Sequence, residues 1–223
     1  MASTFFGLTI AYSGLQAANT SLTITGHNVS NINTKGYTKQ QAGTQAADAL
    51  RTHTTYGAIG SGVVVTEISQ IRDSYYDVKY RNNMANYGQY SVKESYMGQI
   101  EDYLDEFTLN GYSQEYKNFF SAVNQLTITP GDTSAKNQLI NNAKSLADYF
   151  NTLTTNLRNV QADANNEIKD AVQQINSYAK NIAALNRQIN QIEANYGNAN
   201  DLRDKRNAMI DELSEIVNLE TSE

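Results

Sequence analysis

The sequence of 223 residues lacks several residue types that chemistry commonly uses. It contains no cysteine, which excludes disulfide bonds, thiolate metal sites and thiol nucleophiles. Its only histidines, His27 and His53, do not form an HExxH pattern, so a metal site would need carboxylates alone. A net charge of −6 without a basic cluster disfavours nucleic acid as a partner, because phosphate binding needs clustered Lys and Arg. We therefore predict no metal, no cofactor and no nucleic-acid partner.

Charge is also missing from the start of the chain. Met1 to Thr34 contain no Asp, Glu, Lys or Arg, although 18% of the whole chain is charged. Within this stretch, mostly apolar residues recur at alternating spacings of three and four. They are Phe5, Leu8, Tyr12, Leu15, Asn19, Leu22, Gly26 and Val29. This heptad pattern is typical of a helix that packs against another helix.

Two alternatives for the uncharged segment fit less well. A secretory signal peptide has a basic start and an unbroken apolar run, whereas polar residues interrupt every apolar run here. A membrane span would place Gln16, Asn19 and Thr20 in the middle of the bilayer. We therefore predict a helix for protein contacts and no membrane partner. The predicted subunit-interface residues are Phe5, Leu8, Tyr12, Leu15, Leu22 and Val29.

Proline occurs once, at Pro130, so long helices can run on either side of it. Residues 37–70 show no helical period and are expected to be extended, with a short strand around residues 63–68. Heptad-like spacing predicts helices from Ile71 to about Asn110, from Ser113 as N-cap to about Thr127, and over about 60 residues from Thr133. A last helix is expected up to Val217, with Asn198 or Asn200 as its N-cap.

These elements predict a mainly α fold, an elongated antiparallel helical bundle or coiled coil with an N-terminal heptad helix and a short β connector. We divide the chain into an N-terminal helix and loop (1–36), a connector (37–70), a long-helix bundle (71–217) and the start of a missing outer domain (218–223). The sequence is accordingly interpreted as a truncated chain.

Candidates for catalysis are weak. The glycines of the stretch 57–62 resemble a phosphate loop only superficially, because a strand pattern follows them instead of a helix start. Asp201, Asp204, Asp211 and Glu212 are interpreted as the solvated face of an amphipathic helix, because such pairs of acids are common there. We predict no catalytic residues and no enzymatic activity.

The most specific motif is the segment from His27 to Gln40, which follows the uncharged helix directly. Asn and Thr side chains there can cap a helix or close tight turns, and Gly36 can adopt a positive φ. The predicted motif-loop residues are Asn28, Asn31, Thr34, Gly36, Tyr37 and Gln40. Their order resembles the N-terminal signature of the axial proteins of the bacterial flagellum, the family of rod, hook and hook-associated proteins. Ser30 and Lys39 stand where that signature usually has Ala and Arg.

The helical patterns after Ile71 resemble the hook-associated branch of this family, because rod and hook proteins continue mainly into β structure. Further matches occur in the segments 119–130, 185–189 and 200–214, with Arg203 where Leu is usual. The resemblance implies a structural subunit of the flagellum that joins hook to filament by helix–helix self-assembly. Alternatives are another axial protein of the rod or hook, or a secreted coiled-coil adhesin or effector.

The resemblance also implies the partners and the location. In this family the N-terminal helix pairs with a C-terminal helix of the same polypeptide in the inner tube of the axial structure. Implied partners are copies of the chain itself, the hook protein, the next hook-associated protein or filament-side subunits, and an export chaperone. The implied location is extracellular, in the flagellum, after type III export without a cleaved signal peptide.

Overall fold

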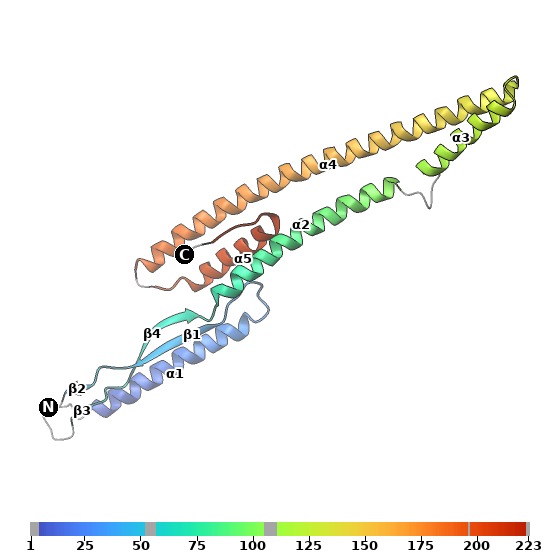
Figure 1. The fold of residues 1–223 in the computed structure, drawn as a ribbon. Coiled ribbons are helices and arrows are strands. Elements are labelled where there is room, and N and C mark those ends of the chain that lie inside the picture. Colours follow the sequence, from blue (N-terminus) through green and yellow to red (C-terminus); the bar gives the residue numbers. More distant parts are fainter. Residues whose placement is uncertain (1–4, 52–56, 105–110, 196, 222–223) are drawn as a thin grey trace. The chain divides into compact units, whose positions relative to one another are not determined.

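The structure is a computed structural model, and it describes residues 5–51, 57–104, 111–195 and 197–221. The described residues are mainly helical (Figure 1). In chain order the elements are α1 (Phe6–Ser30), β1 (Gln40–Ala46), β2 (Leu50–Arg51), β3 (Ala58–Ile59), β4 (Val63–Gln70), α2 (Ser74–Leu104), α3 (Tyr112–Ile128), α4 (Thr133–Glu193) and α5 (Asn200–Ile216). The predicted mainly α fold is confirmed.

The chain forms two compact units. Unit 1 consists of residues 1–85 and 175–223, and unit 2 consists of residues 86–174. Helices α2 and α4 each contribute to both units. The four segments into which the sequence was divided stay a prediction.

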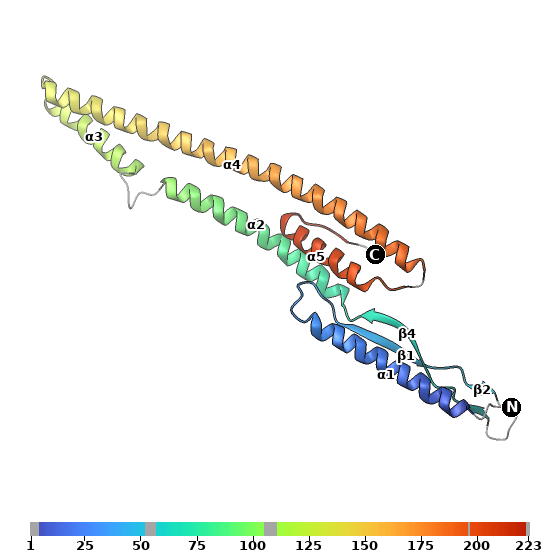
Figure 2. The ribbon, with the colours of Figure 1, turned by 180° about the vertical axis from the view of Figure 1, so that it is seen from behind.

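In unit 1, α1 lies along an antiparallel pair of strands, β1 and β4 (Figures 1 and 2). The pairing runs from Gln40 opposite Gln70 to Ala46 opposite Val63, with a register shift between Gly43 and Thr44. The strand expected at residues 63–68 is therefore confirmed as part of β4. Strand β1 was not predicted as a separate element, because the sequence QQAGTQA has few β-branched residues.

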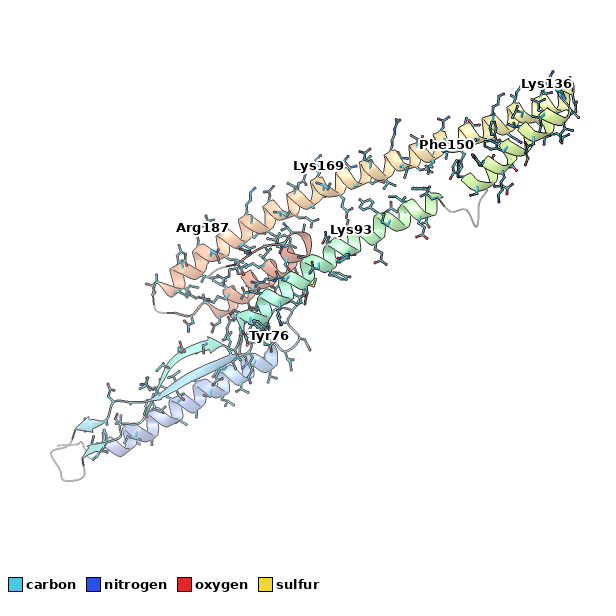
Figure 3. All side chains as sticks on the ribbon, viewed as in Figure 1. Tyr76, Lys93, Lys136, Phe150, Lys169 and Arg187 are labelled. Carbon is cyan, nitrogen blue, oxygen red and sulfur yellow. The ribbon has the colours of Figure 1, made fainter. Side chains whose placement is uncertain are left out.

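Unit 2 is built from helices packed along one another. Ala122 of α3 is buried, as are Ala135 and Val160 of α4. The rings of Tyr112 in α3 and Phe150 in α4 lie 5.7 Å apart between centroids. Figure 3 labels Phe150 on α4. Aromatic rings therefore contribute to the contact between α3 and α4.

Several predicted helix ends were wrong by a few residues. Helix α2 begins at Ser74 instead of Ile71 and ends at Leu104, while its expected end near Asn110 lies outside the described residues. The N-cap of α3 is Gly111 and not Ser113. Helix α5 begins after Ala199, because the side chains of Asn198 and Asn200 bond to β4 instead of capping the helix. Helix α4, with 61 residues, agrees with the prediction.

Candidate assembly surface

Helix α1 has one covered face and one exposed face. The covered face lies on β1 and β4, and both Ala17 and Ile24 are 8% exposed there. The hydroxyl of Ser13 accepts a hydrogen bond of 3.2 Å from the N–H of Val63 at the start of β4. The half-buried or buried positions of this face are Phe6, Ile10, Ser13, Ala17, Thr20, Ile24 and Asn28. This second stripe, also spaced by three and four, was not predicted.

The predicted interface residues lie on the other face, and all of them are exposed. We call them the outward row: Phe5, Leu8, Tyr12, Leu15, Leu22 and Val29. Their exposed fractions range from 64% for Tyr12 and Val29 to 71% for Leu22, and Ile32 extends the row at 78%. At 1.5 Å per residue the row is about 36 Å long. Asn19 and Gly26 separate the apolar members of the row in its second half. Exposed apolar patches on a protein surface are common at sites of protein contact.

Asn28 ties the end of α1 to the start of β1. Its Oδ1 accepts hydrogen bonds from the hydroxyl of Tyr37 at 2.7 Å and from the N–H of Gln40 at 2.9 Å. Its Nδ2 donates to the carbonyl oxygen of Gln40 at 2.9 Å. One side chain therefore satisfies both backbone groups of Gln40, a residue that is only 8% exposed.

Asn31 and Thr34 close the turn that follows α1. The amide of Asn31 donates to the carbonyl oxygen of His27 at 3.0 Å, and the hydroxyl of Thr34 donates to Oδ1 of Asn31 at 3.1 Å. The N–H of Tyr37 then donates to the carbonyl oxygen of Thr34 at 3.1 Å. The first bond ties Asn31 back to the last turn of α1, and the other two hold the turn that follows the helix.

Gly36 lies in the left-handed region, with φ of 79°. A Cβ atom at this position would lie 2.9 Å from the Cβ of Ala208 in α5. Glycine is needed here for two reasons, because the conformation is unfavourable for other residues and the loop touches α5 closely.

Acidic residues of α5 hold the motif loop. The N–H of Thr38 donates to Oδ2 of Asp204 at 2.9 Å, and Nε2 of Gln40 donates to Oδ1 of Asp201 at 2.9 Å. The ammonium group of Lys35 lies 2.9 Å from the carboxylate of Glu212. The hydrogen bond from Lys35 lowers the pKa of Glu212, whereas burial, with smaller contributions from Asp201 and Asp204, raises the pKa of Tyr37.

The interpretation of these acids as a solvated helix face was therefore wrong for Asp204 and Asp211, whereas the side chains of Asp201 and Glu212 are 65% and 43% exposed. Asp204 is only 6% exposed, and Asp211 pairs with Arg81 of α2 at 2.7 Å. Their partners lie more than a hundred residues away in the sequence. Contacts between residues so far apart cannot be predicted from a local pattern in the sequence.

The geometry brings all six predicted motif-loop residues into one structure. Asn28, Tyr37 and Gln40 form one hydrogen-bonded cluster, while Asn31, Thr34 and Gly36 shape the turn next to it. In the part of the chain that the structure describes, no group of three or more His, Asp or Glu side chains could hold a metal ion. None of the described helices combines the length and the apolar character that crossing a membrane requires.

A comparison with protein families decides the assignment. The model of the flagellar hook-associated protein FlgK helical domain matches residues 97–223, more than half of the chain. The chain belongs to the FlgK family. The match begins within α2 and includes α3, α4 and α5, whose acidic residues hold the motif loop.

Relatives of the FlgK family extend the similarity through α1. Flagellar hook-associated protein 1 of Bacillus subtilis (strain 168) is 32% identical over 227 residues, which cover 100% of this chain and 45% of that protein. The protein of the same name from Salmonella typhimurium is 33% identical over 95% of this chain and 38% of its own length. That of Escherichia coli (strain K12) is 31% identical over 95% and 39%, respectively. The chain thus spans less than half the length of these relatives.

Proposed function

We propose that this chain is a structural subunit of the bacterial flagellum that joins hook to filament by helix–helix self-assembly. The outward row of α1 is the observation that supports the proposal most strongly. The exposed fractions of its six members are 64–71%, while the opposite face of the same helix is covered. Membership of the FlgK family disfavours the alternative of a secreted adhesin or effector.

The proposed contact is the burial of the outward row between subunits. Burial of a leucine side chain contributes about 1.5–3 kcal/mol. Because the row has six large members, burying even half of them stabilises a contact by several kcal/mol per subunit. The motif loop then sets the angle at which α1 leaves the rest of unit 1, since it ties the end of α1 to β1 and to α5. This role needs no catalytic group.

The proposed partners are copies of this chain, the hook protein, and the next hook-associated protein or filament-side subunits. An export chaperone and type III export without a cleaved signal peptide are part of the same proposal, as is an extracellular location in the flagellum. The names of the relatives support the flagellar setting.

Complementation of a flagellated bacterium that lacks its own copy of this protein tests the proposal. Leu15→Asp and Leu22→Asp place a charge in the outward row, so we expect hooks without attached filaments and loss of swimming. Gln16→Asp is the matched control, because Gln16 is exposed on α1 but lies outside the row. Normal filament attachment by the two leucine variants, secreted at the level of the control, would overturn the proposal.

A further inference from the structure

Unit 1 contains a cavity of about 1510 Å³ that the proposed function does not use. Its walls come from β4, the first turns of α2, the end of α4, α5 and the segment 219–221, and both views show α5 beside these parts of α2 and α4 (Figures 1 and 2). Four guanidinium groups line it, and we call it the arginine cavity: Arg72, Arg81, Arg203 and Arg206.

Carboxylates in or next to the wall pair with three of these arginines. Arg72 lies 2.6 Å from Asp77, and Arg203 lies 2.6 Å from Glu193. Arg81 lies 2.7 Å from Asp211, whose other oxygen is 3.6 Å from Arg72. The other two carboxylates of the lining, Glu67 and Glu220, are exposed to solvent.

The guanidinium groups act on one another. The pKa of Arg206 is lowered, first by burial and then by repulsion from Arg203, with smaller repulsions from Arg81 and Arg72. Attraction by Glu193 is smaller than the repulsion from Arg203. Guanidinium groups that lie close together in a poorly solvated site repel one another.

Arg81 has unused capacity to donate a hydrogen bond. The residue is only 7% exposed, and its Nη2 is buried without a hydrogen-bond partner among the described residues. Its Nη1 donates to the hydroxyl of Thr221 at 3.0 Å, and its Nε donates to Asp211 at 2.7 Å. A buried charged donor without an acceptor is less favourable than a neutral one.

We propose that the arginine cavity binds a carboxylate of an acidic polypeptide segment, with Arg81 as the main anion-binding residue. The planar fork of a guanidinium group matches the two oxygens of a carboxylate. A polypeptide fits better than a single small anion, because the volume exceeds the roughly 300–1,000 Å³ of ordinary small-molecule pockets. An extended segment that includes Leu219 and Thr221 already lines the cavity. The hydroxyl group of Thr221 accepts a hydrogen bond from Arg81. A carboxylate takes the place of that hydroxyl and also reaches Nη2.

The inference is independent of the outward row, and it is tested on the 223-residue chain with three probes. These are a capped hexaglutamate peptide, a capped hexalysine peptide and sodium sulfate, compared at equal ionic strength by calorimetry and by thermal melting. We expect saturable binding and a raised Tm with hexaglutamate alone. No response to hexaglutamate, or an equal response to sulfate, overturns the proposal.

Two variants locate the site. Arg81→Gln is expected to weaken hexaglutamate binding at least tenfold. Since this change also removes the partner of Asp211, a second variant avoids the risk of misfolding. Asn207→Glu adds a carboxylate to the cavity wall, so we expect a higher Tm and at least tenfold weaker hexaglutamate binding. Asn190→Glu is the matched control, because Asn190 is exposed on α4 outside the cavity, and it should bind like the unchanged chain. A lower Tm or unchanged hexaglutamate binding in Asn207→Glu contradicts the assignment.

Discussion

Replacement of Asn28 by alanine should detach the motif loop from the end of α1. The change removes three hydrogen bonds, one from Tyr37 and two with the backbone of Gln40. A neutral hydrogen bond contributes about 0.5–1.5 kcal/mol, and a buried group that loses its partner costs more. Because Gln40 is buried, we expect the free energy of unfolding of unit 1 to fall by about 2–4 kcal/mol.

Two further variants separate hydrogen bonding from helix propensity and side-chain volume. Asn19→Ala is the control for helix propensity, because Asn19 is exposed on the same helix. Replacing Asn by Ala raises helix propensity by a similar few tenths of a kcal/mol at both positions. Asn28→Asp keeps the size and the acceptor oxygen but replaces the donor to the carbonyl of Gln40 with a second oxygen. We therefore expect it to be destabilised as well, whereas a purely steric role for Asn28 predicts almost no change.

Urea unfolding gives the free energies, and amide hydrogen exchange at Gln40 reports the loop itself. The expected result is faster exchange at Gln40 in both Asn28 variants and unchanged exchange in Asn19→Ala. Surface substitutions usually change the free energy of unfolding by no more than about 0.5 kcal/mol. If the free energies of unfolding of Asn28→Ala and Asn19→Ala differ by less than about this amount, the hydrogen-bonded cluster does not hold the loop.

Three more changes have defined outcomes. Gly36→Ala should lower stability by at least about 1–2 kcal/mol in urea unfolding, because φ is 79° and the side chain meets α5. The hydrogen bond that Tyr96 donates to Glu167 raises the pKa of Tyr96 to about 12. This hydrogen bond therefore stabilises the fold below pH 10, and the stabilisation is lost as pH rises from 10 to 12. An ultraviolet titration that shows Tyr96 ionising near pH 10, identified by comparison with Tyr96→Phe, would contradict this. The hydrogen bond from Arg203 lowers the pKa of Glu193, so this ion pair stabilises the fold above pH 4.5 and the stabilisation is lost as pH falls further. In Glu193→Gln, the free energy of unfolding should therefore depend less on pH in the acid range.

The outward row could be predicted from the sequence because it depends only on spacing along one helix. Leu8, Leu15 and Leu22 recur every seven residues, and the period continues to Val29 although Asn19 and Gly26 occupy two of its positions. The covered face of α1 has the same period but is made of residues as small as Ala17 and Ser13, which give a weaker apolar signal. Its partner, β1, has little strand propensity of its own and is stabilised by its pairing with β4.

The composition of the motif loop was predictable, whereas its partners were not. Gly36 and Asn28 are typical turn and cap residues, so a tight turn after α1 followed from the sequence. The carboxylates that hold the loop lie on α5, and a charged residue on an amphipathic helix is usually solvated. Only the folded chain shows that Asp204 is buried against Thr38 and that Asp211 lies between Arg72 and Arg81.

Burial of the outward row in the assembled flagellum is measured most directly by the reactivity of a single thiol. The chain contains no cysteine, so Leu15→Cys and Leu22→Cys each introduce one unique site for a maleimide reagent. In the isolated chain both thiols should react rapidly, because the leucines they replace are 68% and 71% exposed. We predict at least tenfold slower labelling in assembled flagella. Equally rapid labelling of both positions in assembled flagella would contradict a role for this face of α1 in subunit contacts.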